Sequence, residues 1–180
     1  MRIVGGKYRH RLIVFPEDSH TRPTKDRIRE AIFSALGDIS NTKVLDLYAG
    51  SGAMGLEALS RGAKKATFVD ISNFAIKAIK ENVSSLKLND DEYQIIKDKD
   101  IAALEIFKNS KQQFDIVFLD PPYEQGEYQK IVELLLEKDL LAKNAILVIE
   151  ANREIQLEKI DYQKNKAYHY GEISVFIYWR

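Results

Sequence analysis

The sequence predicts an α/β protein with a doubly wound, seven-stranded, mostly parallel sheet and a small N-terminal β-hairpin and helix extension. Short apolar runs alternate with segments of helical periodicity from residue 43 onward, which is typical of βαβ units and a parallel sheet. The last two apolar runs flank Gly171 with no helix between them, which indicates a closing antiparallel hairpin. We expect residues 1–40 to form the extension and residues 41–180 the main domain.

The composition is that of an ordinary globular protein and argues against several kinds of chemistry. Apolar residues make up 45% and charged residues 30% of the 180 residues. There is no cysteine, which excludes disulfides and thiol nucleophiles, and with only three histidines a zinc site is not expected. No apolar stretch approaches the ~20 residues that cross a bilayer, and the first residues do not form a signal peptide. We therefore expect a cytoplasmic protein that uses no metal and contacts no membrane.

The positive charge is concentrated at the start of the chain. The net charge is zero, but residues 1–30 hold eight basic side chains against four acidic ones. We expect residues 1–15 to form two short strands around Gly5-Gly6 or nearby, with basic side chains interleaved with Tyr8 and His10. This mixture suits a surface that contacts phosphates and stacks on bases, although a solvated amphipathic hairpin would show the same pattern. The candidate nucleic-acid contacts are Lys7, Arg9, Arg11, Arg22, Thr24, Lys25 and Arg27.

A helix is expected to follow this segment. Thr24 is a suitable N-cap, and Gly37 is expected to end the helix. Lys25, Arg27 and Arg29 lie off the apolar stripe, so we expect all three to stay free to meet anions.

The central part of the chain predicts a βαβ unit with a ligand site. A strand over residues 44–48, a glycine-rich turn and a helix are followed by a second strand over residues 66–69. Gly50 and Gly52 allow the backbone to approach a ligand closely, and the helix that follows directs its free N–H groups to the same place. Asp70, at the tip of the second strand, can accept hydrogen bonds from a ribose diol. The unit therefore predicts a site for a nucleoside cofactor.

Two classes of cofactor fit this turn. Gly50, Gly52 and Gly55 satisfy G-x-G-x-x-G, and Asp70 follows Gly50 by 20 residues, as in a dinucleotide site. Asp46, however, lies inside the first strand, where a carboxylate suits a ligand with a cationic amino-acid part better than a pyrophosphate. Together with the Ala-Gly-Ser-Gly turn, Asp46 resembles the first motif of S-adenosylmethionine-dependent methyltransferases.

The remaining elements bring further acids to the same edge of the sheet. Asp70, Asp98 or Asp100, and Asp120 fall at or just past strand ends, where doubly wound sheets bind ligands. The expected later elements are a helix capped by Ser72 and running to about Lys87, strands over residues 93–96, 114–119, 145–149, 166–170 and 173–179, and helices over residues 101–107 and 128–137.

The fourth strand ends in Asp120-Pro121-Pro122-Tyr123. The two prolines fix φ and lack an N–H, so their carbonyls are held rigidly. With the Asp120 carboxylate they form a rim of acceptors that complements an exocyclic NH₂ group, and Tyr123 can lie over the plane of a base. We take these four residues as the candidate catalytic residues.

These motifs together resemble a known family. Asp-Pro-Pro-Tyr after the fourth strand resembles the amino-methyltransferases, which methylate planar NH₂ groups. The chain as a whole resembles the RsmD-like 16S ribosomal RNA guanine-N2 methyltransferases, of the guanine-966 type. The segments that carry this resemblance are residues 2–6, 22–24, 26–27, 29–30, 46–61 and 120–123.

The resemblance implies a class I, Rossmann-like methyltransferase fold and S-adenosylmethionine as cofactor, with S-adenosylhomocysteine as product. Asp70 would hold the ribose, with Ile71 against the adenine, and Asp100 and Ile101 would meet the adenine edge. The spacing leaves Asp98 as an alternative to Asp100. The residues that would line the methionine part are Asp46, Ala49, Gly50, Ser51 and Gly52.

The expected partner is 16S ribosomal RNA, presented by a partly assembled small ribosomal subunit, and the expected state is a monomer. Alternatives remain at this level. An adenine-N6 methyltransferase on DNA or RNA would also use Asp-Pro-Pro-Tyr, whereas a protein-glutamine methyltransferase usually carries Asn at the position of Asp120. A nicotinamide-dependent oxidoreductase would leave residues 120–123 unexplained. A catalytically silent RNA-binding module would have no reason to combine Asp46, Asp70 and Asp120.

Overall fold

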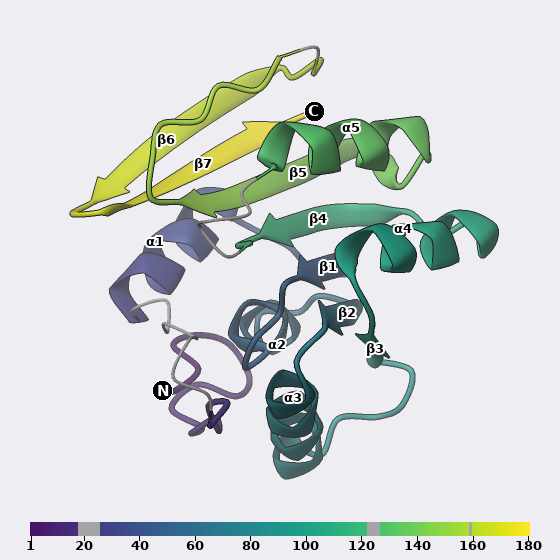
Figure 1. Ribbon diagram of the computed structural model, residues 1–180. Helices are drawn as coiled ribbons and strands as arrows, with labels where there is room; N and C mark the ends of the chain where they lie inside the picture. Colours follow the sequence, from purple (N-terminus) through teal and green to yellow (C-terminus); the bar gives the residue numbers. More distant parts are fainter. Residues whose placement is uncertain (18–25, 122–126, 159) are drawn as a thin grey trace.

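A computed structural model describes residues 1–17, 26–121, 127–158 and 160–180. It confirms the predicted doubly wound sheet of seven strands (Figure 1). The strand order is β3-β2-β1-β4-β5-β7-β6. Strands β1 to β5 are parallel to one another, whereas β7 pairs antiparallel with both β5 and β6. The strands are β1 Lys43–Leu47, β2 Lys65–Asp70, β3 Tyr93–Lys97, β4 Phe114–Leu119, β5 Leu141–Ala151, β6 Lys164–Tyr170 and β7 Ile173–Trp179.

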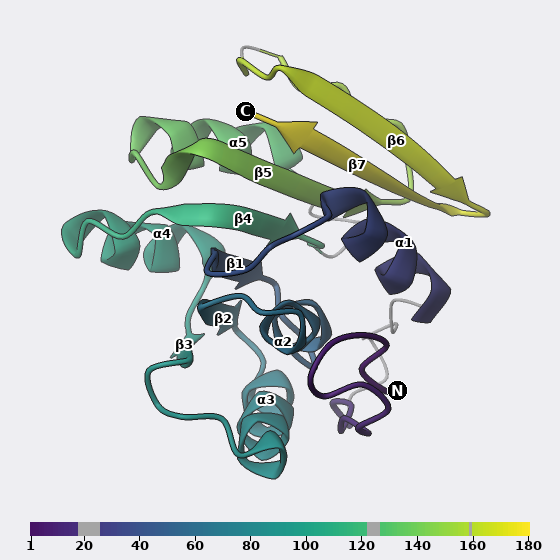
Figure 2. The same cartoon turned by 180° about the vertical axis from the view of Figure 1, so that it is seen from behind.

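Helices cover both faces of this sheet, which is the arrangement seen from opposite sides in Figures 1 and 2. Helices α4 and α5 bury Phe107 and Leu135 in one cluster with the β1 residues Leu45 and Leu47. Helices α1, α2 and α3 pack on the other face. The helices are α1 Asp26–Leu36, α2 Ala53–Ser60, α3 Asn73–Leu86, α4 Asp100–Asn109 and α5 Tyr128–Glu137.

The strand order places the topological switch point between β1 and β4. The chain moves outward from β1 through β2 to β3 and then returns to the other side of β1 with β4. Leu47 of β1 is level with Leu119 of β4, so the turn after β1 and the segment after β4 leave the sheet side by side. A crevice at this point is where doubly wound sheets bind their ligands.

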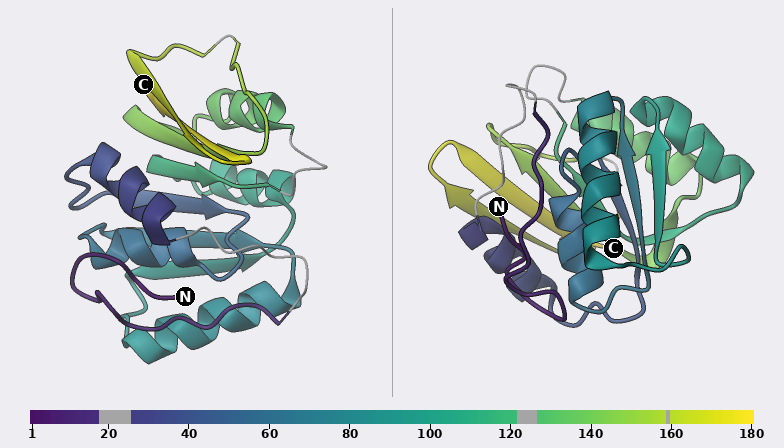
Figure 3. Two further views of the ribbon diagram at one scale, coloured as in Figure 1. Left: turned by 90° about the vertical axis from the view of Figure 1, so that its left-hand side faces the viewer. Right: turned by 90° about the horizontal axis from the view of Figure 1, so that it is seen from below.

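Residues 1–15 do not form the expected pair of strands. A single antiparallel bridge joins Arg2 to Leu12, and the chain turns between them at residues 7–10, close to Gly5-Gly6. The segment instead lies along α2 and α3 (Figure 3), where Ile3 and Ile13 join a buried cluster with α2 and α3 side chains. The Glu57 carboxylate of α2 accepts the Val4 and Gly5 N–H groups, which in a hairpin would donate to the opposite strand.

The expectation that Arg29 is free to meet anions is also wrong. Its side chain is 0% exposed and donates hydrogen bonds to the Arg2 carbonyl and to Asp26. The prediction failed because helical periodicity identifies the face that packs on the sheet, but not a second face that the N-terminal segment covers.

The other helix and strand bounds agree closely with the sequence. Gly37 follows α1 with a φ of 73°, and Ser72 caps α3 by accepting the Ala75 N–H. The one large difference is β5, which begins at Leu141 because the chain already pairs with Phe114 there, on the far side of an irregularity in the ladder. None of the helices in the described ranges is long and apolar enough to cross a membrane.

Candidate active site

The glycine-rich turn after β1 is built from residues in the left-handed region of backbone conformation. Tyr48, Gly50 and Gly52 have φ values of 77°, 54° and 78°. The turn is tied to the sheet because the Tyr48 and Ala49 N–H groups both donate to the Val69 carbonyl of β2. It closes on itself through a 2.7 Å hydrogen bond from the Gly52 N–H to the Ala49 carbonyl. Gly52 then begins α2 without a side-chain cap.

Gly55 has a different role from the other two glycines of the motif. A Cβ at this position would lie 2.3 Å from a ring carbon of Phe68 on β2. The absence of a side chain therefore lets α2 pack closely on the sheet. The same residue donates its N–H to the Asp46 carboxylate at 2.9 Å, so the strand acid and the helix start are directly linked.

Asp46 is a buried acid. Only 4% of it is exposed, and burial raises its pKa to about 7; the Gly55 N–H lowers the pKa in part, and the nearby Asp70 raises it further. A carboxyl in such a place is stabilised by a cation that enters the crevice.

Asp120 lies across the crevice from the glycine turn. One pocket is lined by Asp46, residues 49–51 of the turn, Asp120 and Glu150, among others. Burial raises the pKa of Asp120 well above its usual range, and the charges of Glu150 and Asp46 raise it further. Ile149 of β5 is level with Leu119 of β4, which explains why Glu150 lies beside Asp120. No lysine or arginine is among the described residues that line this pocket.

A second group of predicted residues lies on the β2 and β3 side of the turn. Asp70 accepts the Gly50 and Ser72 N–H groups, both at 2.8 Å. Asp100 accepts the Tyr48 hydroxyl at 2.6 Å and the Ile101 N–H at 2.7 Å. Asp100 therefore reaches the turn through Tyr48, whereas Asp98 accepts from the Lys99 N–H.

The apolar side chains of this second group are open to solvent. Ile71 is 59% exposed and Ile101 is 42% exposed. They do not line the pocket that contains Asp120, and the two groups meet at Gly50, which lines the pocket and donates to Asp70. The site is therefore elongated, with a recess near Asp46 and Asp120 and an open shelf of apolar and acidic side chains beside it.

The predicted RNA contacts lie on or near the N-terminal segment. Lys7, Arg9 and Arg27 are exposed. Arg11 is exposed as well, but its guanidinium donates to the Ser85 carbonyl at the end of α3. The predicted residues Arg22, Thr24 and Lys25, and the motif residues Pro122 and Tyr123, lie outside the described ranges. Pro121 is described and is buried.

The structure adds residues that the sequence reasoning missed. Glu150 follows the core of the fifth strand much as Asp120 follows the fourth, so the rule that flagged Asp120 applies to it too. Tyr48 was assigned only to a strand, although burial and the Asp100 carboxylate raise the pKa of its hydroxyl and keep it a donor. Met1 and Phe15 also line the pocket, for which no local sequence signal exists.

This geometry restricts the chemistry of the site. Acid side chains converge on one recess, where they can attract a cation and accept hydrogen bonds from an amine. The shelf offers Asp70 and Asp100 as acceptors and Ile71 and Ile101 as apolar surface, which suits a ribose and a flat base. The site fits a ligand that joins a cationic part to a nucleoside.

Comparisons with known proteins agree with this geometry. The family model described as "Conserved hypothetical protein 95" matches residues 1–179. The chain is 34% identical to ribosomal RNA small subunit methyltransferase D of Haemophilus influenzae, over 86% of this chain and 80% of that protein. It is 31% identical to the Escherichia coli protein of the same name, over 100% of this chain and 90% of that protein. The solved structure of Escherichia coli YhhF matches with a TM-score of 0.83 at 31% identity, and the match covers 100% of this chain and 97% of that chain.

Proposed function

The chain belongs to the family of the ribosomal RNA small subunit methyltransferases D, and from this premise we propose that it transfers a methyl group from S-adenosylmethionine to the exocyclic N2 amine of a guanine in 16S ribosomal RNA. Its fold is that of the class I S-adenosylmethionine-dependent methyltransferases, as the sequence resemblance predicts. Membership of this family supports the methyltransferase reaction.

The observation that carries the proposal is the single pocket that the glycine turn and Asp120 share. The cofactor turn of a nicotinamide enzyme would need no acceptor at Asp120. A transferase that joins a methyl donor to an amine needs both parts within one recess, because the reacting atoms must meet in line.

The residues that would hold the cofactor divide between recess and shelf. Asp46 and the turn residues 49–52 would hold its methionine part, where the carboxylate can attract the positive charge. Asp70 would hold the ribose diol, with Ile71, Asp100 and Ile101 around the adenine. When bound, S-adenosylmethionine supplies a methyl group that its sulfonium already activates.

Asp120 and the Pro121 carbonyl would accept the hydrogens of the target amine. The lone pair of a guanine N2 is delocalised into the ring, and acceptors on its hydrogens favour a more tetrahedral, more nucleophilic nitrogen. Burial and the acids beside it raise the pKa of Asp120, so Asp120 can also take up the proton that the methylated amine releases. Pro122 and Tyr123 remain predicted members of this rim.

We propose that residues 1–40 form the RNA-facing part of the protein and hold the RNA. Residues 41–180 would form the methyltransferase domain. Lys7, Arg9 and Arg27 are exposed and can contact phosphates. The target base must be unpaired or flipped out to reach the recess. Because the chain carries no net charge, we propose a partly assembled small subunit as the substrate, acted on by a monomer.

The test is methyl transfer from labelled S-adenosylmethionine into 16S RNA, free and within small-subunit particles from cells that lack the native enzyme. We expect N2-methylguanosine, with faster transfer on particles. In Asp120→Ala we expect transfer to fall by about 10²–10³-fold, as for the removal of one group that hydrogen-bonds to a transition state, while S-adenosylhomocysteine still binds. The matched control is Asp115→Ala, which removes an acid from the other end of β4, where it accepts the Lys43 N–H.

Other products would redirect the proposal. Label in N6-methyladenosine would keep the mechanism and replace the substrate. Binding of NADH in preference to S-adenosylhomocysteine would reject the methyltransferase reaction itself. Equal rates on free RNA and on particles would reject the assembly intermediate as the preferred substrate.

A further inference from the structure

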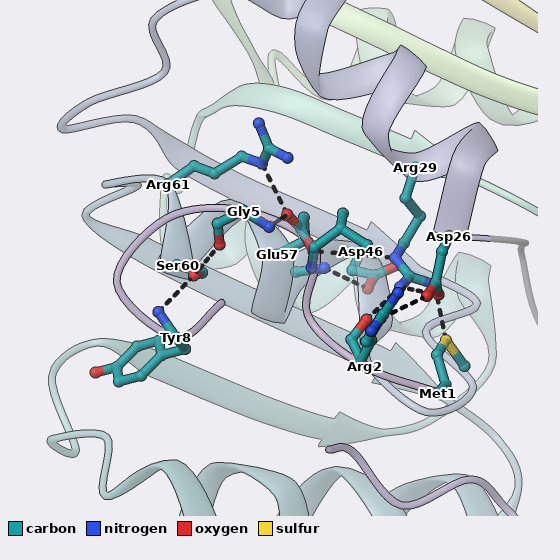
Figure 4. Close-up of polar contacts among 12 residues, drawn as sticks. Met1, Arg2, Gly5, Tyr8, Asp26, Arg29, Asp46, Glu57, Ser60 and Arg61 are labelled. Carbon is teal, nitrogen blue, oxygen red and sulfur yellow. Dashed lines mark hydrogen bonds and ion pairs between the residues drawn. The ribbon is translucent and has the colours of Figure 1, made fainter. Parts of the chain in front are cut away.

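The N-terminal segment, residues 1–15, is attached to α2 by a buried carboxylate. Glu57 is 0% exposed and accepts the consecutive N–H groups of Val4 and Gly5, each at 2.8 Å (Figure 4). The Arg61 guanidinium donates to the same carboxylate at 2.8 Å, and that of Arg29 lies 4.0 Å away. One acid on the cofactor-side helix thus binds the backbone of a segment more than 50 residues away in sequence.

Ser60 completes this attachment one turn later on α2. Its hydroxyl donates to the Gly5 carbonyl and accepts the Tyr8 N–H (Figure 4), and its carbonyl accepts the Lys7 N–H at 2.7 Å. The approach is so close that a Cβ at Gly6 would lie 1.8 Å from the Ser60 carbonyl oxygen. The Gly5-Gly6 pair therefore serves docking onto α2 and not a hairpin turn.

A second attachment joins the other end of the segment to the cofactor turn. Asn82 of α3 is 0% exposed. Its side-chain amide accepts the Val14 N–H at 2.6 Å and donates to the Val14 carbonyl at 2.9 Å. The same amide donates to the Ser51 carbonyl at 3.0 Å, within the glycine turn. The next residue, Phe15, lines the pocket.

Between the two attachments the segment forms a closed loop that carries basic side chains. The Ile3 N–H donates to the Arg11 carbonyl and the His10 N–H to the Ile3 carbonyl. The exposed side chains of Lys7 and Arg9 project from this loop, and the Lys7 ammonium lies 5.0 Å from the centre of the Tyr8 ring. The loop is thus held at both ends by groups that also belong to the cofactor-side helices.

We infer that Glu57 is a positioning residue for the nucleic acid: it holds the basic loop of residues 7–11 at a set place relative to the recess, and so aligns the bound RNA with the methyl donor. This inference rests on the proposed function. Glu57 touches neither RNA nor cofactor in this arrangement, and acts through the backbone of Val4 and Gly5.

A purely structural role for Glu57 would be seen in stability but not in the kinetic constants. If Glu57 only stabilised the fold, the folded fraction of a variant would bind RNA as the wild type does. If it positions the loop, the KM for RNA must rise while kcat and the affinity for S-adenosylhomocysteine change little, because the recess itself stays intact.

The experiment uses the full chain with small-subunit particles and compares Glu57→Gln and Gly6→Ala with the wild type. Glutamine keeps the shape of the side chain but places an NH₂ group where an acceptor is needed. Alanine at Gly6 displaces the loop without touching the side chains of α2. For each we expect the KM for RNA to rise by about tenfold, the size of one missing charge-assisted hydrogen bond, with kcat within about twofold. The matched control is Glu105→Gln, which removes the charge of an acid on α4 that pairs with Lys138.

Amide hydrogen exchange provides the second measurement. Exchange at Val4 and Gly5 should be slow in the wild type and fast in Glu57→Gln, with core amides of β4 unchanged. A wild type that methylates no RNA would overturn the proposed function. If the wild type is active and both variants have its KM for RNA, despite faster exchange at Val4 and Gly5, the positioning role of Glu57 would be overturned. The proposed function would then still stand.

Discussion

Helix α2 is associated with two buried carboxylates, Asp46 and Glu57, and the surroundings of the two acids differ. At the start of the helix, Asp46 accepts the Gly55 N–H and has Asp70 and Asp120 as charged neighbours. Near the end, Glu57 accepts two N–H groups and an arginine, with a second arginine close by. The described residues that line the pocket around Asp46 include no lysine or arginine, whereas Glu57 has two arginine side chains beside it.

From this difference we predict that the Asp46 site binds a cationic ligand, whereas the carboxylate of Glu57 already has its partners within the chain. A buried acid without a compensating charge is costly to ionise, and its cost is offset only when a cation binds. A buried acid with arginines and N–H groups is satisfied in the free protein and stabilises it. The comparison therefore predicts that removing each acid has an opposite effect on stability.

The largest effect is expected for Glu57→Ala. Removal of the carboxylate takes an ion-pair partner from the buried Arg29 and the acceptor from the Val4 and Gly5 N–H groups. The loss of one partner of a buried pair costs about 3–5 kcal/mol. Urea unfolding should show this loss in the free energy of unfolding. Glu105→Ala, in a more exposed pair, should lose far less, and an equal loss in the two variants would contradict the comparison.

The opposite sign is expected for Asp46→Asn at pH 8. The pKa of Asp46 is raised from about 3.8 to about 7 by folding, so its contribution to stability is full below pH 4 and is lost as the pH rises to 7. Asparagine does not ionise and still accepts the Gly55 N–H. The free energy of unfolding of the ligand-free variant should therefore exceed that of the wild type by up to about 4 kcal/mol at pH 8.

The measurement for Asp46→Asn is the free energy of unfolding of both proteins at pH 5 and pH 8. Asp120 adds a slope of the same sign, so the difference between wild type and variant is the quantity that reports on Asp46. The variant should also bind S-adenosylmethionine more weakly. A variant that is less stable than the wild type at pH 8 would show that Asp46 is already compensated in the free protein.

The smallest effect on stability is expected for the paired substitution Lys7→Ala and Arg9→Ala. Both side chains are exposed on the N-terminal loop, so the folded protein should be unaffected. RNA affinity should fall, and the slope of log affinity against log salt should become shallower by about 0.7–0.9 for each phosphate that the variant no longer neutralises. Lys108→Ala on α4 is the matched control, and an equal change of slope there would show that the loop has no special part in binding.

Much of the site was predictable because its signals are local. The glycine turn, the acids at strand ends and the Asp120-Pro121 step each follow from the chain within a few residues, and the parallel sheet brings strand ends to one edge. Asp46, residues 49–51 and Asp120 accordingly meet in one pocket. Glu150 directly follows the predicted strand over residues 145–149, so the same rule applies to it and its signal was present in the sequence.

Other features depend on contacts between segments that are far apart in sequence. The hydrogen bond from the Tyr48 hydroxyl to Asp100 joins residues 52 positions apart, so spacing within Lys-Asp-Lys-Asp cannot express it. The burial of Arg29 depends on the N-terminal segment, where the Arg2 carbonyl accepts from its guanidinium. The docking of Gly5 depends on Glu57 of α2, which accepts its N–H. Local periodicity and turn chemistry therefore account for the strands, the helices and the cofactor turn. Several segments of the chain could satisfy the Arg29 guanidinium and the backbone N–H groups of the N-terminal segment. Which segment does so is decided by tertiary packing, and local sequence does not specify it.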